Sequence, residues 1–499
     1  MEKSTQIILT SLFALLLWSL RGFFQWLYIY FYHQWMTRNF PGPKTLPLIG
    51  SAHLIKGGLL GFPEFLMREA EKVTEQGGIL MRTWVGPILR VYLFDPEAIK
   101  VVTNSTTELR KGKDYDRLHP WLGSGLITAS GDEQWRSNRK LLTPAFHFGK
   151  LEEYAEVIDG HARELVDVLS SQYADGKQHD IYNVIKCMTL DAISETAMGI
   201  QVNSLQNPDQ EYIKAVDTYN SLVFFRGAVP IYLNKWIWKL SGWEKVQNDA
   251  LKVLKTTSTS VIKKRIELLQ SGLDEMKTKR DFLDILLVAH KEGRMNFEQM
   301  RQEVDSFLFA GYDTTAHAIS WTIWYLATNP NVQEKLYREI SEKLNGDADF
   351  CTNKTKELPY FEAVIKESLR IYPPVAGFAR HLENDLQVGE YLVPKGANLM
   401  VSILCLHHNK NIFSDHWQFK PERFLQPGDY SPNSYIPFSA GLRNCIGQKF
   451  AMRELRNVIA HLVYNFRFST DHKMLDNKPI IKVVLTPSLG VPVKLQSRN

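Results

Sequence analysis

A single cysteine between two glycines constrains this 499-residue chain more than any other feature. Cys445 lies four residues after Gly441 and two before Gly447, and helix-forming residues begin at Gln448. The glycines predict a tight loop at the start of a helix, where backbone N–H groups and the helix dipole stabilise a thiolate. The alternative is an inert buried cysteine, which is the usual state of a lone thiol. We expect that inert state for the other cysteines, Cys187, Cys351 and Cys405.

The stretch FLFAGYDTTAHAISW (residues 307–321) predicts a buried helix with polar residues in its middle. A glycine at position 311 costs about 1 kcal/mol relative to alanine, and a buried carboxylate at Asp313 costs more unless it is paired. A threonine hydroxyl can bond back to the carbonyl four residues earlier and bend the helix. The pattern indicates a loosened turn, although Thr314 and Thr315 are also compatible with ordinary helix hydroxyls.

Composition limits the class of protein. Hydrophobic residues make up 44% of the chain and aromatic residues 12%, which is enough for a large core with a cavity inside it. The net charge is only +5, so we expect no nucleic-acid partner. Wide cysteine spacings without a C-x-x-C pair argue against a disulfide scaffold. The sequence has no G-x-G-x-x-G loop in a βαβ context and no four-cysteine cluster pattern, so electrons for a redox reaction must come from another protein.

The N-terminal segment differs in composition from the rest. Residues 7–20 carry no charge, Arg21 follows, and an aromatic-rich apolar run continues the segment. Together the runs are long enough for a membrane span of about 20 residues, provided that Arg21 snorkels. We therefore expect residues 1–36 to be a retained membrane anchor, with the body in the cytosol. Residues 37–50 predict a Pro/Gly hinge, and residues 51–499 a single large domain.

The body is expected to be mainly α with small β-sheets. Residues 79–86 and 88–94 predict a hairpin, and Asp95-Pro96 predicts the start of a helix. Residues 150–345 have mostly helical periodicity, and another helix is expected to begin at Asn329-Pro330. Strand character returns at 386–403 and 480–494. The expected architecture is one large helical domain with a small β region at either end of the chain.

The cysteine loop carries a family resemblance. The pattern F-x-x-G-x-R-x-C-x-G is met by Phe438, Gly441, Arg443, Cys445 and Gly447. It resembles the haem-binding loop of the cytochromes P-450. The resemblance implies that residues 51–499 are a haem-binding catalytic domain holding haem b (iron protoporphyrin IX). It implies that Cys445 is the axial iron ligand, that Phe438 packs by the thiolate, and that Arg443 pairs with a haem propionate.

Other stretches agree with this resemblance and occur in the right order. Trp135 and Arg139 match the W-x-x-x-R of the family's propionate-contacting helix, and Arg380 lies where another propionate partner is expected. A solvated arginine is the alternative for each arginine taken singly. The family's buried Glu-Arg-Arg network is matched by Glu367, Arg370 and Arg423. An E-x-x-R pair by itself would be a surface ion pair of little value.

The polar residues in the stretch 307–321 also agree with the family resemblance. Residues 310–315 resemble the family's distal-helix signature, A/G-G-x-D/E-T-T/S. The resemblance implies that Gly311 leaves room above the iron, that Thr314 hydrogen-bonds dioxygen, and that Asp313 relays protons. Residues 114–148 and the cysteine loop look like family four, the branch that includes fatty-acid omega-hydroxylases. Those enzymes often have a glutamate, esterified to the haem, where this chain has Ala310. Because alanine cannot form that ester, we expect the haem to be bound without it. Whether the chain shares the omega-regiospecificity of those enzymes stays open.

The family implies a set of partners. These are O₂, a lipophilic substrate (a fatty acid, eicosanoid, sterol or terpenoid), membrane lipid, and an NADPH-dependent flavoprotein reductase at the endoplasmic reticulum membrane. Candidate docking residues for the reductase are Arg136, Lys140, Lys449, Arg453 and Arg456, for which solvated surface charge is the alternative. Candidate pocket residues are Leu126, Ile127, Phe307, Phe309 and the ranges 375–378 and 487–489, for which plain core packing is the alternative.

Two other functions compete with a membrane-bound monooxygenase. One is an isomerase or dehydratase of the same fold that rearranges peroxides without oxygenation. Members of that kind usually lose the distal threonine, so an intact Asp313-Thr314 pair argues against it. The other is a haem- or lipid-binding protein without turnover, which the complete set of proton-relay residues disfavours.

Overall fold

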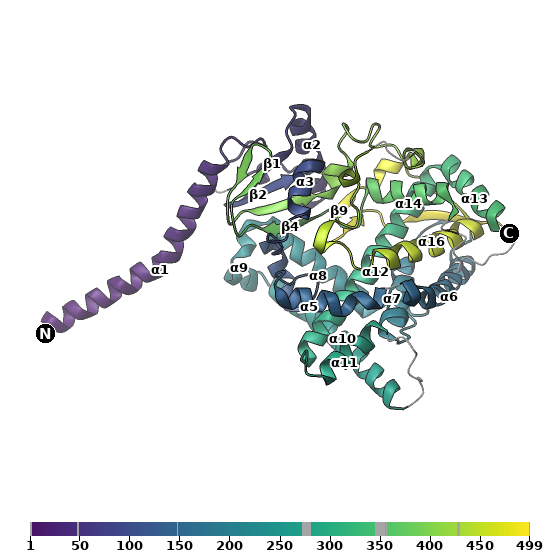
Figure 1. Cartoon of the computed structure of the whole chain (residues 1–499), viewed down its shortest axis with the longest axis horizontal. Coiled ribbons are helices and arrows are strands. Elements are labelled where there is room, and N and C mark those ends of the chain that lie inside the picture. Colours follow the sequence, from purple (N-terminus) through teal and green to yellow (C-terminus); the bar gives the residue numbers. More distant parts are fainter. Residues whose placement is uncertain are drawn as a thin grey trace.

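The computed structural model describes residues 2–46, 49–146, 148–271, 281–344, 355, 357–426 and 430–498. Helices form most of the body, and the strands gather toward one part of it (Figure 1). The fold is therefore mainly α with small β-sheets, as the sequence predicts. Cys351 lies outside the described residues.

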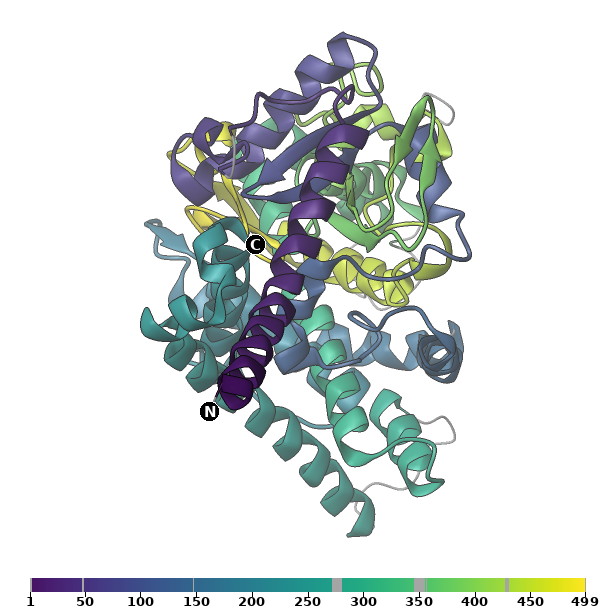
Figure 2. The same cartoon turned by 90° about the vertical axis from the view of Figure 1, so that its left-hand side faces the viewer.

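The first helix, α1 (Glu2–Met36), extends away from the body (Figures 1 and 2). Its C-terminal end is attached, because Tyr30 packs edge-to-face on Trp84 with ring centroids 5.3 Å apart. Within the described ranges, no helix combines the length and apolarity needed to cross a membrane. The described helices thus give no support to the membrane anchor expected over residues 1–36. That expectation depends mainly on residues 7–19, whose side chains lie outside the described part.

The segment expected to be a hinge is tied to the sheet. The Arg82 N–H donates to the Pro41 carbonyl at 2.8 Å, and the Ser51 N–H donates to the Trp84 carbonyl at 2.7 Å. Gly50 has φ +70°, and a Cβ there would lie 2.1 Å from the Trp84 oxygen, so only glycine fits this close approach. These contacts fix the entry of the chain into the body.

The main sheet has four strands in the order β1-β2-β7-β4. Strands β1 (Leu80–Val85) and β2 (Ile88–Leu93) form the expected antiparallel hairpin. Strand β7 (Asn398–Ser402) runs parallel to β2, and β4 (Gly377–His381) runs antiparallel to β7. Strands thus lie toward both ends of the chain, and β2 from the first region pairs with β7 from the second within one sheet.

Three smaller sheets complete the strands in the described ranges. The first pairs β5 (Leu386–Val388) with β6 (Tyr391–Val393), and the second pairs β9 (Pro479–Ile481) with β10 (Leu485–Pro487). The third has the order β3-β11-β8 and contains β3 (Gln178–Asp180), β11 (Pro492–Ser497) and β8 (Phe466–Ser469).

The helices begin where the sequence predicts starts. Asp95 accepts from the N–H groups of Glu97 and Ala98 at 2.9 and 3.1 Å and caps α3. The helices after α1 are α2 (Phe62–Glu75), α3 (Pro96–Thr103), α4 (His119–Leu122), α5 (Glu133–Leu142), α6 (Phe148–Gln172), α7 (Tyr182–Met198), α8 (Glu211–Ala228), α9 (Lys235–Leu240), α10 (Trp243–Gln270), α11 (Phe282–Lys291), α12 (Phe297–Thr328), α13 (Pro330–Leu344), α14 (Pro359–Ile371), α15 (Ile403–His407) and α16 (Gln448–Asn465).

The 32-residue helix α12 passes through the centre of the body and is buried over most of its length (Figure 1). It packs against α7, α10, α14 and α16. In its second half α12 joins the largest hydrophobic cluster through Trp321 and Trp324. Its start is fixed by a reciprocal capping box between Asn296 and Gln299. Polar residues in its middle are therefore held far from bulk water.

Candidate functional site

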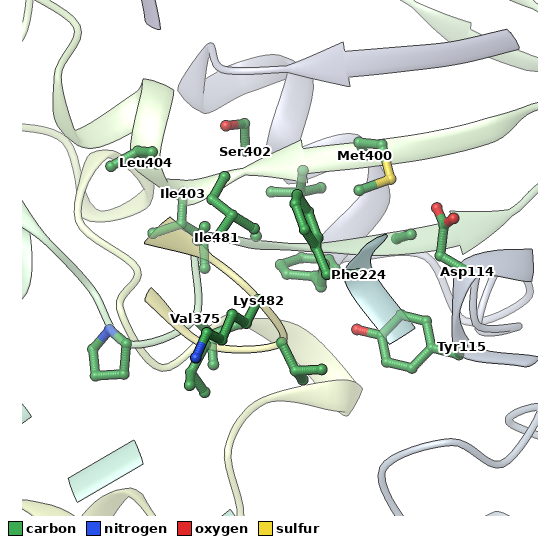
Figure 3. Close-up of a pocket in the computed structure, with 18 of the residues that line it drawn as sticks. Asp114, Tyr115, Phe224, Val375, Met400, Ser402, Ile403, Leu404, Ile481 and Lys482 are labelled. Carbon is green, nitrogen blue, oxygen red and sulfur yellow. The ribbon is translucent and has the colours of Figure 1, made fainter. Parts of the chain in front are cut away.

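A cavity of about 760 Å³ lies between α12, the cysteine loop and the main sheet. Figure 3 shows that its side chains come from distant parts of the sequence, including Phe224 of α8, Met400 of β7 and Ile481 of β9. Among the expected pocket residues, those that line the cavity are Leu126, Ile127, Phe307, Phe309 and residues 375–378. The expectation for residues 487–489 is wrong, because the chain segment that lines the cavity there is 481–484.

Cys445 faces this cavity from the loop before α16. Its N–H donates to the Phe438 carbonyl at 2.9 Å. Gly441 has φ +72°, and a Cβ there would lie 1.8 Å from the Thr103 oxygen, so the loop requires glycine. Desolvation by the surrounding protein raises the pKa of the Cys445 thiol, whereas the Gly447 N–H and Arg139 lower it in part. The loop thus presents one sulfur to the cavity.

One wall of the cavity carries several cations. Lys111 and Arg380 are directly opposite in an antiparallel bridge, and the Gly112 N–H donates to the Ala379 carbonyl at 3.1 Å. Opposed residues have Cβ atoms about 5 Å apart, and like charges in that position repel. Desolvation lowers the pKa of Lys111 well below its ordinary value, and Arg380 and Arg443 add to the effect. Desolvation also lowers the pKa of Arg443 to about 9.

The donor atoms on this wall fit the carboxylates of haem. Buried nitrogens without a hydrogen-bond partner among the described residues include Trp135 Nε1, Arg380 Nε and Arg443 Nε. Three unpaired donors beside opposed cations match a ligand with two carboxylates, because buried polar groups without partners are costly. The apolar remainder of the cavity suits the macrocycle, and the sulfur of Cys445 at the cavity surface is of the type that can ligate its iron. The residues present therefore fit haem.

Lys111 is a site residue that the sequence reasoning missed. It belongs to no recognised motif, and its position is set by the bridge to β4, which pairs residues about 270 apart in sequence. A lysine before Gly112 looks like a loop cation in the sequence. Only the pairing with Arg380 brings it to the cavity wall.

The two residues of the W-x-x-x-R pattern take different roles. The Arg443 guanidinium lies 4.0 Å from the ring centroid of Trp135, which is cation–π geometry. Arg139 donates from both terminal nitrogens to Asn444, to its carbonyl oxygen and its Oδ1, each at 2.8 Å. Both residues line the cavity, but Arg139 is directed to the residue before the cysteine.

On α12, the two threonines bond back to the helix as expected. Thr314 Oγ1 donates to the Ala310 carbonyl and Thr315 Oγ1 to the Gly311 carbonyl, each at 2.7 Å. Ala310 and Thr314 line the cavity. The main chain stays helical from Phe297 to Thr328, so the loosened turn is limited to these hydroxyl contacts.

Gly311 has a packing role that the sequence did not indicate. It does not belong to the residues that line the cavity. A Cβ at Gly311 would lie 2.5 Å from Cγ1 of Ile193, on α7. The glycine is therefore needed for the close approach of α7 to α12.

Asp313 is fully buried on the side of α12 that faces α7 and α8. Its Oδ1 lies 3.8 Å from Nζ of Lys186, which itself contacts Oδ1 of Asp217 at 2.5 Å. Desolvation raises the pKa of Asp313, while His317 and Lys186 lower it in part. Lys186 and Asp217 are partners that no sequence pattern identified. Asp217 is 42% exposed, so this chain of charges connects Asp313 with the surface.

The three residues expected to form a structural network meet in the fold. Arg370 donates from Nε and Nη2 to the two oxygens of Glu367 at 2.7 and 2.9 Å. Arg423 Nε donates to Glu367 Oε1 at 3.0 Å. Glu367 and Arg370 are fully buried. A buried pair of charges held by several hydrogen bonds fixes α14 against the segment that carries Arg423.

A family model described as Cytochrome P450 matches residues 40–494, which is most of the chain. The chain belongs to the cytochrome P450 family. Human cytochrome P450 4V2 is 35% identical over 91% of this P450 and 89% of its own length. The probable cytochrome P450 4s3 of Drosophila melanogaster is 37% identical over 93% of each chain, and cytochrome P450 4c3 of the same fly is 34% identical over 92% of this chain and 89% of its own. These relatives confirm the resemblance to family four.

Membership of the family settles the class of reaction. This P450 is a haem monooxygenase, and its haem iron is ligated by a cysteine. The arrangement of Cys445, the cationic wall and Thr314 around one cavity agrees with that class.

Proposed function

We propose that this P450 inserts one oxygen atom from O₂ into a lipophilic substrate, with electrons from an NADPH-dependent flavoprotein reductase, at the cytosolic side of the endoplasmic reticulum membrane. The observation that carries the proposal is the single cavity that joins Cys445 to a long apolar lining reaching β1, β2 and α8. Bound haem supplies the oxygen chemistry at this site. The protein binds and orients the substrate and delivers protons.

The polar residues of the site have different roles. The Thr314 hydroxyl lies at the cavity surface, and its proton is donated to the Ala310 carbonyl. Its oxygen can accept a hydrogen bond in the cavity, and it can donate there by exchanging the bond to Ala310. Asp313 holds a proton readily, because desolvation raises its pKa, and Lys186 with Asp217 links it to solvent. Trp135, Arg380, Arg443 and Lys111 line the cavity wall that would hold the propionates of bound haem. Cys445, in the loop with Phe438 and Gly447, would bind its iron.

The lining supports a lipophilic substrate. Phe307 and Phe309 of α12, Val375 and Phe378 provide apolar surface near the cysteine end. The charged groups at the other end are largely paired: Arg90 and Arg117 both contact Asp114 Oδ1, at 2.8 and 2.6 Å. Binding of an apolar substrate to this lining is favoured by about 25 cal/mol for each Å² of apolar surface removed from water. Fatty acids, eicosanoids, sterols and terpenoids all satisfy this requirement.

The surface near the cysteine loop supports docking of an acidic reductase, although with fewer residues than expected. Arg136 and Lys140 on α5 and Lys449 on α16 are exposed. Arg456 is instead paired with Glu362 at 2.8 Å, and Arg453 donates to Glu152 at 2.9 Å. We assign docking to the three exposed cations, since charge complementarity governs encounter.

Exposed apolar side chains support contact with a membrane surface. Trp236 and Leu240 of α9 are 63% and 86% exposed, and Ile231 before α9 is 59% exposed. Figure 1 shows α9 and α1 on the same side of the molecule. On α1, Phe24, Tyr28 and Trp35 are exposed as well, and aromatic residues suit the headgroup region.

The test begins with the cofactor. The reduced protein with CO should give the Soret band of thiolate-ligated haem, and Cys445→Ala should lose it; a histidine-type spectrum would contradict the assignment. Turnover of a lipid panel with product mass analysis should then show addition of one oxygen that depends on NADPH and reductase. Rearrangement of peroxides without NADPH would support the isomerase, and binding without any product would support a carrier.

A further inference from the structure

Residues 123–129, between α4 and α5, form part of the cavity wall and consist of turns and bends. Leu126 and Ile127 of this segment line the cavity, and Leu126 is buried. A segment outside helices and sheets keeps its place only when neighbouring elements bind its backbone polar groups. The contacts of residues 123–129 therefore decide where this part of the wall lies.

Helix α12 binds the N–H groups of this wall segment. The Leu126 N–H donates to Oε2 of Glu303 at 3.0 Å, and the Ser124 N–H donates to Oε1 of Gln302 at 3.0 Å. Gly125 lies between these two residues, and a Cβ there would be 2.9 Å from the main-chain oxygen of Gln302. The backbone of the segment thus lies directly against α12, and glycine avoids a clash at the closest point.

The second oxygen of Glu303 connects the segment to α5. Oε1 accepts from Nδ2 of Asn138 at 3.0 Å, so each carboxylate oxygen takes one donor. Glu303 is 1% exposed and does not line the cavity, and within the described part of the chain no cation pairs with it. Desolvation raises the pKa of Glu303 to about 7, and the bonds from Leu126 and Asn138 oppose that rise. This costly buried carboxylate joins three elements at one point.

The carbonyl groups of the wall segment are bound from the other side. Arg443 donates from Nη1 to the Leu126 carbonyl at 3.4 Å and from Nη2 to the Ala129 carbonyl at 2.5 Å. Arg443 also belongs to the cationic wall, where its Nε has no partner among the described residues. A substitution of Arg443 would therefore disturb the haem site, whereas Glu303 can be changed without altering the cavity lining.

We propose that Glu303 is a positioning residue that sets the shape of the substrate cavity by holding Leu126 and Ile127 in place against α12. The proposal rests on the haem and substrate site proposed above, and it adds a residue that touches neither ligand. Loss of the carboxylate leaves the Leu126 N–H without its acceptor, so the segment separates from α12 and the wall contacts a long apolar ligand less well. A small polar ligand at the iron has little surface for this wall, so its affinity stays unchanged.

Three substitutions test the carboxylate. Glu303→Leu removes both acceptor oxygens at similar volume. Glu303→Gln keeps one oxygen for the Leu126 N–H, and its amide group can donate to Asn138 once the Asn138 amide rotates. Asn138→Leu removes only the second bond. The matched control is Glu454→Gln, which alters another buried carboxyl with a raised pKa, on α16, that has no hydrogen bond to residues 123–129 in the described structure.

Two readouts are measured on each holoenzyme at pH 8, where the Glu303 carboxyl is mostly ionised. The first is amide hydrogen exchange in the peptide that covers residues 123–129. The second is the affinity of two probes, imidazole and 1-dodecylimidazole, followed by the shift of the Soret band. Both probes bind haem iron through the same ring nitrogen, and only the second carries a long apolar chain for the cavity lining.

We expect Glu303→Leu to speed exchange in residues 123–129 by about tenfold and to weaken binding of 1-dodecylimidazole by about tenfold, which is the range for loss of a charged hydrogen bond. Imidazole should bind as it does to the parent. Glu303→Gln should stay within about twofold of the parent in both readouts, and Asn138→Leu should speed exchange by about threefold. Glu454→Gln should change neither readout, although it changes stability.

Unchanged exchange in residues 123–129 in Glu303→Leu would overturn the proposal, because other contacts would then hold the segment. If that variant yields no holoenzyme, unchanged exchange in Asn138→Leu decides in the same way. An equal loss of affinity for both probes, or equal effects in Glu454→Gln, would also overturn it, since either result indicates general damage. Absence of a Soret shift with imidazole in the unmodified protein would instead contradict the haem site itself, so the two failures are distinct.

Discussion

Lys111 and Arg380 lie directly opposite each other across an antiparallel bridge, at the wall of the cavity that contains Cys445. Two cations in this position repel, and desolvation increases the cost. The arrangement is stable when a ligand with negative charge lies between them. The backbone bridge therefore places two positive charges where the cofactor has its carboxylates.

Lys111→Met should speed the transfer of haem to a haem-scavenging protein by roughly tenfold, because one charged hydrogen bond is lost. The same change should stabilise the cofactor-free protein by about 0.5 to 1 kcal/mol, by removing the repulsion. The pKa of Lys111 is lowered in the folded protein, so the unfolded chain binds more protons and the stability of the cofactor-free protein rises with pH. Urea unfolding across pH measures this slope, which the variant should lack.

Lys113→Met is the matched control for Lys111, since Lys113 is exposed and lies outside the cavity lining. It should change neither haem transfer nor the pH slope. Equal effects of the two substitutions would show that only overall charge matters.

Gly311→Val should lower the free energy of unfolding by about 1 to 3 kcal/mol, because its side chain enters the space of Ile193. Urea unfolding of the holoenzyme provides the measurement. Ile193→Ala in the same chain should recover part of the loss, since it opens space at the contact between α7 and α12. A change in substrate affinity at unaltered stability would contradict this account and place Gly311 at the cavity.

Glu454 on α16 is fully buried, and both of its carboxylate oxygens lack a hydrogen-bond partner among the described residues. Desolvation raises its pKa to about 8. A carboxyl with a raised pKa in the folded state stabilises most at low pH, and this contribution is lost as pH rises from about 4.5 through 8. Stability should therefore fall across that window.

Glu454→Gln should flatten that dependence and make the protein more stable than the parent above pH 8. The order of magnitude is several kcal/mol, at about 1.4 kcal/mol per pKa unit. Denaturant unfolding at a series of pH values tests it. Parallel pH curves for the two proteins would show that Glu454 is not the group responsible.

Ala310 lines the cavity where family four often has an esterified glutamate. Its methyl group cannot form an ester, so mild acid with organic solvent should extract all of the haem. The released haem is identified by mass as unmodified iron protoporphyrin. Haem that stays with the polypeptide after extraction would contradict the prediction.

Several structural features could be predicted from the sequence because they depend on local interactions. The Asp95 cap, the hairpin over β1 and β2, and the glycine-bounded loop at Cys445 each depend on residues a few positions apart. Turns, caps and helix starts are decided at that range. The same holds for the back-bonded threonines, whose partners lie four residues away.

The features that the sequence did not reveal depend on contacts between distant segments. One example is the contact of Gly311 with Ile193 on another helix. Lys111 acquires its role from a bridge to β4, and the two β regions merge because β2 pairs with β7. No local pattern encodes such pairings, since many segments of similar hydrophobicity could pair equally well.

The sequence by itself determined the family, the cysteine that binds iron in that family, and the residue types around it, because a ligand loop has strict requirements over ten residues. Tertiary structure decided where each charge acts. It placed Arg139 on Asn444, Lys111 beside Arg380, and Asp313 against Lys186. The direction of a long side chain depends on which partners the fold brings within about 3 Å, and that is a property of packing across the whole chain.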